Sequence, residues 1–168
     1  MLWKGDEKEE VRKEIPYKNK YLYFIIRPID DRICLYCSGV NISRFLPVTR
    51  GRHRLGQNPV EKGLQSVNYG VRSLLISKGS IIKSAKGNLC PDVMNKGDDL
   101  WYTESFMIED CSPELASEVI NYAVLSLLKK IFTALMLDEK IPERLTEPFE
   151  MENYLENLCK KYTQKEIS

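Results

Sequence analysis

Apolar positions recur along the chain at two different spacings, and each spacing predicts a different kind of element. The aromatic and β-branched runs at residues 21–27 and 33–37 flank a turn, which is typical of a β-hairpin. Residues 81–85 and 100–108 predict two further strands, the second with alternate side chains on opposite faces. Residues 88–99 are mostly polar or turn-forming, so we expect a loop there.

Three helices are predicted by apolar stripes at helical spacing. The first begins at Pro59, where Asn58 is a favourable N-cap and proline suits the first turn. The second follows a cap at Ser112 and runs to about residue 137. The third starts at residues 146–148 and continues close to the C-terminus of the chain.

The end of the first helix has two interpretations, because Gly63 and Gly70 lie beside its apolar stripe. Each glycine costs a helix about 1 kcal/mol relative to alanine. Either the glycines allow another element to approach closely, with Gly79 as the C-terminal stop, or the helix ends near residue 69. In the second case, residues 71–84 would form a hairpin instead.

These elements predict a single α+β domain. Strands in pairs, a central helix, more strands and two C-terminal helices indicate a mixed or antiparallel sheet with helices packed on it. Residues 6–14 are polar on nearly every side, so residues 1–16 are expected to form a solvated helix or a frayed extension that ends at Pro16. No internal repeat or linker divides the chain.

Bulk composition is that of a globular protein, with 43% hydrophobic and 29% charged residues. The charged start does not resemble a signal peptide, so we expect a cytoplasmic or nuclear protein with reduced cysteines. The most apolar stretch, residues 119–137, is interrupted by Lys129 and Lys130. It predicts a core helix rather than a membrane span.

The net charge of +1 hides an uneven layout of charged residues along the chain. Residues 44–91 hold nine Lys or Arg against Glu61 alone, a net charge of +8. Residues 92–168 hold eight Lys or Arg against sixteen Asp or Glu, a net charge of −8. Such asymmetry indicates either an anionic partner or an acidic C-terminal part that folds over the basic middle and neutralises it.

The densest positive charge falls on residues 48–62, which lead into the first predicted helix and include its first turn. Glycines there allow close approach to a ligand, the helix N-terminus favours anions, and guanidinium groups match phosphate oxygens in bidentate fashion. No Walker loop or dinucleotide-binding glycine motif is present. The candidate ligand-binding residues are Arg44, Arg50, Arg52, His53, Arg54, Asn58, Arg72, Lys83 and Lys86.

A second basic cluster, with two lysines, lies at residues 83–87. Together with the arginine-rich stretch, and with Tyr69 and Arg72 between the two, it could bind along a single strand of nucleic acid. We therefore expect a non-enzymatic binding module for a phosphate-bearing partner, with nucleic acid favoured. Two alternatives stay open. One is a small enzyme on an anionic metabolite or nucleotide, with Arg and His stabilising charge, and the other is an adaptor subunit that binds an acidic protein.

No metal or cofactor is expected. Cys34 and Cys37 form a CxxC pair, and a zinc site would need two further ligands, for which Cys90, Cys111 and His53 are available. On a regular strand, however, residues three apart point to opposite faces and cannot share a metal. Buried free thiols are the expected state of these cysteines.

Overall fold

The computed structural model describes residues 10–49, 58–83, 92–97 and 99–167. Six strands and four helices lie within these ranges. In chain order they are β1 (Ile15–Lys18), β2 (Leu22–Pro28), β3 (Ile33–Asn41), α1 (Leu46–Thr49), α2 (Pro59–Ser77), β4 (Ile81–Lys83), β5 (Asp92–Lys96), β6 (Asp99–Glu109), α3 (Pro113–Ala134) and α4 (Pro148–Ile167).

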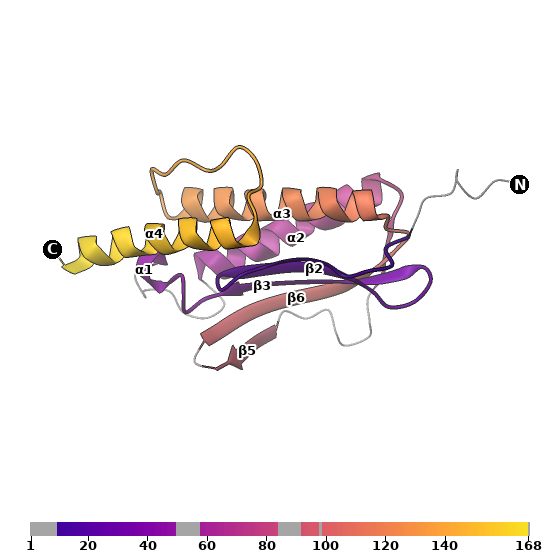
Figure 1. Cartoon of the computed structure of the whole chain (residues 1–168), viewed down its shortest axis with the longest axis horizontal. Coiled ribbons are helices and arrows are strands. Elements are labelled where there is room, and N and C mark those ends of the chain that lie inside the picture. The colour runs from indigo at the N-terminus through magenta and orange to yellow at the C-terminus, as the bar shows by residue number, and fades with distance from the viewer. Residues whose placement is uncertain (1–9, 50–57, 84–91, 98, 168) are drawn as a thin grey trace, which may run out of the picture.

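The strands form one antiparallel sheet in the order β1-β2-β3-β6-β4 (Figure 1). The predicted hairpin of β2 and β3 is present, and β3 pairs along nine residues with β6. The opposite edge of β6 is shared by β4 at residues 107–109 and β5 at residues 99–103. The α+β class is therefore confirmed, with an antiparallel sheet.

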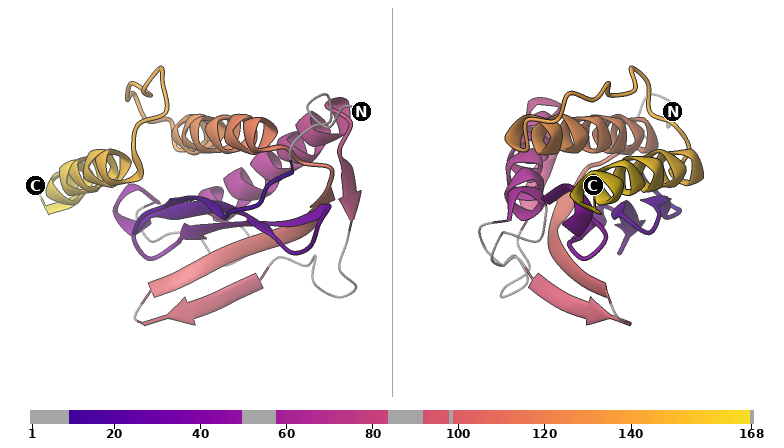
Figure 2. Two further views of the ribbon diagram at one scale, coloured as in Figure 1. Left: turned by 45° about the vertical axis from the view of Figure 1, so that its right-hand side comes forward. Right: turned by 90° about the vertical axis from the view of Figure 1, so that its left-hand side faces the viewer.

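The three long helices, α2, α3 and α4, lie on the same side of the sheet (Figure 1). Helix α2 packs on β3 and α3 packs on β1 and β2, while α2 and α3 pack on each other. The β5–β6 hairpin curves away from this helical layer (Figure 2). Within the described residues, no helix combines the length and apolar character needed to cross a bilayer.

Burial alternates along β6, so that one face of this strand packs against the helices. Tyr102, Glu104, Phe106 and Ile108 are buried on the helical side, while residues between them are more exposed, as the alternation predicts. The same rule applies to the cysteines of β3. Cys34 is buried and opposite Ile108, whereas the half-buried Cys37 points to the other face.

Helix α2 runs unbroken to Ser77. The interpretation as a continuous helix is therefore confirmed, and the alternative hairpin over residues 71–84 is not formed. The Asn58 side chain accepts a hydrogen bond from the Val60 amide at 2.8 Å, as an N-cap does. Gly79, at φ +93°, follows the helix in the left-handed region that favours glycine. The helix therefore starts and stops where its local signals indicate.

Two short strands were not predicted. Residues 88–99 were expected to be a loop, which is wrong for β5. Its sequence, DVMNK, is poor in strand-forming residues, and its pairing with β6 across a turn at Gly97 sets its conformation. Gly97 has φ +67°, which glycine adopts readily.

The other unpredicted strand is β1, whose first two residues, Ile15 and Pro16, fall in the segment expected to fray. Residues 10–14 form no helix. Val11 is buried, and its amide donates to the Cys111 carbonyl at 3.2 Å. Pro16 lies in β1 at the edge of the sheet, where a residue without an amide hydrogen is tolerated. Val11 thus packs against the fold, while residues 12–14 of this segment are exposed.

Candidate functional site

A groove of about 720 Å³ lies between the outer faces of α2 and α3. Pro59, the first residue of α2, lines one end of it. Gly63 faces α3 at this end, where a Cβ would lie in ordinary van der Waals contact, 3.4 Å from the Leu127 side chain and 3.5 Å from Ile131. Both glycines of α2 face α3, but only at Gly70 would a Cβ overlap α3, at the Tyr122 hydroxyl. Close approach, the first of the two interpretations, therefore applies to Gly70.

Three lysines give the groove its charge. Lys62 comes from the first turns of α2, and Lys129 and Lys130 come from the last turns of α3. All three are exposed, and none takes part in an ion pair among the described residues. The described lining holds no acidic residue, so the three ammonium groups would attract an anion that enters the groove.

Hydroxyl groups accompany the lysines along the groove. Ser66 comes from α2, and Tyr122, Ser126 and Thr133 come from α3. A hydroxyl can donate a hydrogen bond to a phosphate oxygen and an ammonium group attracts it by charge, so both kinds of group suit a phosphate-bearing ligand.

Two side chains of the protein, Asn58 and Glu61, already interact with the N-terminus of α2. Asn58 is 1% exposed and its carboxamide oxygen is used for the cap. Glu61 lies buried in the first turn, where a carboxylate interacts favourably with the positive end of the helix dipole. Attraction for an anion at this end of the groove therefore comes chiefly from lysine side chains rather than from spare amides.

Four of the nine predicted ligand-binding residues lie within the part of the chain that the structure describes. Arg50, Arg52, His53, Arg54 and Lys86 lie outside the described residues. The described ones, Arg44, Asn58, Arg72 and Lys83, each make contacts within the protein.

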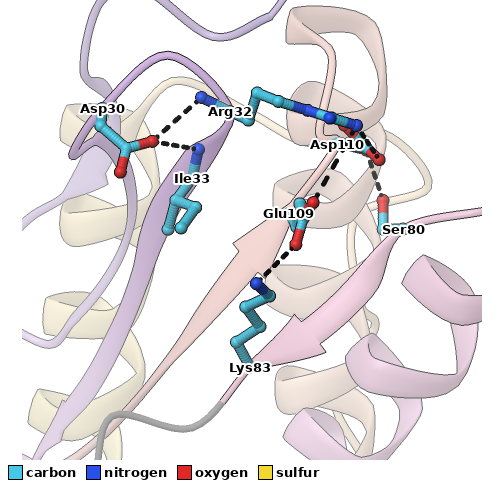
Figure 3. Close-up of polar contacts among 7 residues, drawn as sticks. All are labelled: Asp30, Arg32, Ile33, Ser80, Lys83, Glu109 and Asp110. Carbon is cyan, nitrogen blue, oxygen red and sulfur yellow. Dashed lines mark hydrogen bonds and ion pairs between the residues drawn. The ribbon is translucent and has the colours of Figure 1, made fainter.

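Arg44 and Lys83 pair with acids from the second half of the chain. Arg44 Nε lies 3.7 Å from an Asp99 carboxylate oxygen. Lys83 Nζ lies 2.8 Å from Glu109, beside a second ion pair between Arg32 and Asp110 (Figure 3). The basic middle of the chain is thus neutralised in part by the acidic end, as one of the two interpretations of the charge layout expected.

Arg72 lies over aromatic rings instead. Its guanidinium carbon is 5.0 Å from the centroid of the buried Phe106 ring and 5.6 Å from that of Tyr69. Both distances suit cation–π attraction. The positive charge of Arg72 also lowers the pKa of Glu104, which burial raises. Arg72 therefore joins the outer surface of α2 to a buried polar cluster beneath it.

That buried polar cluster ties α2 to the sheet. Gln65 donates to the Tyr102 hydroxyl at 2.8 Å, and Tyr102 donates to the Glu104 carboxylate at 2.9 Å. Burial is the main cause that raises the pKa of Glu104, and hydrogen bonds from Tyr102 and Asn68 oppose it. The carboxyl group is thus engaged by the protein itself.

A second chain of hydrogen bonds runs through Asn68. Tyr36 donates to the Asn68 oxygen at 2.6 Å, and the Asn68 amide donates to Ser38 at 2.9 Å. All three side chains are fully buried. Mutual satisfaction of buried polar groups is a structural role, so we do not assign ligand binding to this cluster.

Sequence reasoning missed the groove. Lys129 and Lys130 were noticed only as an interruption of an apolar stretch, and Lys62 only as part of a charge count. The signal was present, because charged residues in an otherwise apolar helix mark its exposed face. Which second helix would lie beside that face is not a local property.

Comparison of the chain with protein-family models, with curated proteins and with solved structures found no match. The function is therefore inferred from the site alone.

Proposed function

We propose that the protein is a non-enzymatic binding module for a phosphate-bearing partner, with nucleic acid as the favoured partner. The observation that carries this proposal is the lysine-lined groove between α2 and α3. Exposed ammonium groups attract phosphates without regard to sequence, and this attraction supplies most of the affinity in non-specific nucleic-acid binding.

The arginine-rich segment also precedes one end of the groove in the chain. Residues 50–57 precede Asn58 directly in the chain, and Pro59 lines the end of the groove. We expect a polyanion in the groove to bind Arg50, Arg52 and Arg54 as well, because the chain connects them to the start of α2. An extended partner with repeated phosphates suits this layout better than a single small anion.

The test is fluorescence anisotropy of the full chain with a labelled 15-nucleotide single strand, titrated at several salt concentrations between 50 and 200 mM. We expect affinity to fall steeply with salt because bound counterions are released from the strand. The triple variant Lys62→Ala, Lys129→Ala, Lys130→Ala should bind more weakly. Its slope of log affinity against log salt should fall by about 2, since each lost phosphate contact removes roughly 0.7 for single strands.

The matched control replaces three exposed lysines away from the groove: Lys13→Ala, Lys140→Ala, Lys160→Ala. It changes the net charge equally and should keep the wild-type slope. The variant Arg50→Ala, Arg52→Ala tests the preceding segment, and we expect weaker binding with folding nearly intact. Equal losses in both triple variants, or no binding by the wild type, would contradict the proposal.

A further inference from the structure

Tyr69 is an aromatic residue that the core does not use. Its side chain is 70% exposed on α2. Lys62, Ser66 and Tyr69 follow each other at spacings of four and three residues, so they lie on one face of the helix. Because α2 rises about 1.5 Å per residue, Tyr69 stands roughly 10 Å along the helix from Lys62. An exposed ring thus continues the line of the groove's α2 wall.

The Tyr69 ring rests on a well-anchored neighbour. Arg72 lies 5.6 Å from its centroid and 5.0 Å from that of Phe106, which is buried in the sheet. The charge of Arg72 also faces the buried Glu104. A ring held in this way loses little freedom when a second flat group stacks on it, and this favours binding.

We propose that Tyr69 is a stacking platform for a nucleobase and that the partner of the groove is a single-stranded nucleic acid. This inference rests on the proposed function and specifies its partner. Phosphates lie along Lys62, Lys129 and Lys130, and a neighbouring base stacks on the Tyr69 ring. Aromatic platforms beside basic grooves bind single strands in this way, whereas the bases of a duplex are already stacked on one another.

The experiment compares three probes with the full chain: a labelled 15-nucleotide oligothymidylate, the corresponding 15-base-pair duplex, and inorganic polyphosphate as a competitor without bases. We expect Tyr69→Ala to weaken oligothymidylate binding about tenfold, as loss of one stacked base does. The salt slope should not change, because no charge is removed. Tyr69→Phe should bind like the wild type, and Tyr69→Leu should bind like Tyr69→Ala.

Phe149 supplies the matched control, because it is an aromatic residue of similar exposure, 69%, at the start of α4. Phe149→Ala should bind oligothymidylate like the wild type. Circular dichroism and urea unfolding of every variant confirm that it is folded. The Phe and Leu variants separate the π face of the ring from its bulk.

The outcomes distinguish this inference from the function on which it rests. If oligothymidylate and polyphosphate bind through the groove lysines but Tyr69→Ala binds like the wild type, the stacking platform is wrong and phosphate recognition stands. Duplex binding as tight as single-strand binding overturns the choice of partner in the same way. If none of the probes binds, both proposals fail.

Discussion

Glu104 places a carboxyl group between α2 and the sheet, where it is 8% exposed. Burial raises its pKa above the ordinary value of 4.5, although Tyr102, Asn68 and Arg72 all favour its ionised form. At the scale of single residues, these surroundings therefore offset only part of the cost of burying the charged form of this carboxyl group. Such a group changes stability with pH, because the folded and unfolded chains bind its proton differently.

The raised pKa of Glu104 fixes the sign of that effect. From pH 4.5 up to the raised pKa, folded Glu104 keeps a proton that the unfolded chain loses, so its contribution to stability falls as pH rises through this window. Glu104→Gln cannot ionise and still offers an oxygen to Tyr102. We expect this variant to gain stability relative to the wild type between pH 4.5 and 8, measured by urea unfolding.

The exposed Glu143→Gln is the control for this pH series, and its stability should follow that of the wild type. A constant difference between Glu104→Gln and the wild type across the whole pH range would contradict the assignment.

At the scale of elements, the two glycines of α2 contribute differently to its packing against α3. A Cβ at Gly63 would make ordinary contacts with Leu127 and Ile131, whereas a Cβ at Gly70 would overlap the Tyr122 hydroxyl. The packing therefore requires glycine at only one of the two positions. Gly63 sits where a methyl group fits, and Gly70 leaves room for a side chain that lines the groove.

Alanine substitution should separate these two positions. Gly63→Ala should stabilise the protein by up to about 1 kcal/mol, the gain in helix propensity, because its methyl group has room. Gly70→Ala should not be more stable than the wild type, because its methyl group displaces Tyr122 and this cancels the gain in helix propensity. In a Tyr122→Ala background, Gly70→Ala should be stabilising. Urea unfolding of the four variants and the wild type measures these differences. Marked destabilisation by Gly63→Ala would contradict the room assigned to its methyl group.

At the scale of the whole molecule, charge is divided between internal pairing and the groove. Arg44, Lys78 and Lys83 from the basic middle pair with Asp99, Glu118 and Glu109 from the acidic end. Exposed pairs of this kind contribute between 0 and about 1 kcal/mol each and weaken with salt. The groove lysines form no such pair among the described residues, so their charge is free to act on a ligand.

Salt should therefore affect binding and stability very differently. Raising NaCl from 50 to 500 mM should change the free energy of unfolding by no more than about 2 kcal/mol, because the hydrophobic core carries most of the stability. Over the same range, oligonucleotide affinity should fall by orders of magnitude. Urea unfolding and anisotropy measure the two quantities. A loss of stability as steep as the loss of affinity would show that the ion pairs hold the fold together.

Local sequence signals determined the start of α2 at Asn58 and Pro59, the β2–β3 hairpin and the alternating faces of β6. Each depends on residues within a few positions of one another, through a cap, a turn or a side-chain period. The tertiary structure alone decided the rest. Strand β5 exists through its ladder to β6, and Lys62 meets Lys129 and Lys130 only because α2 packs beside α3. Groups far apart in sequence share a site through long-range packing, which no local pattern encodes.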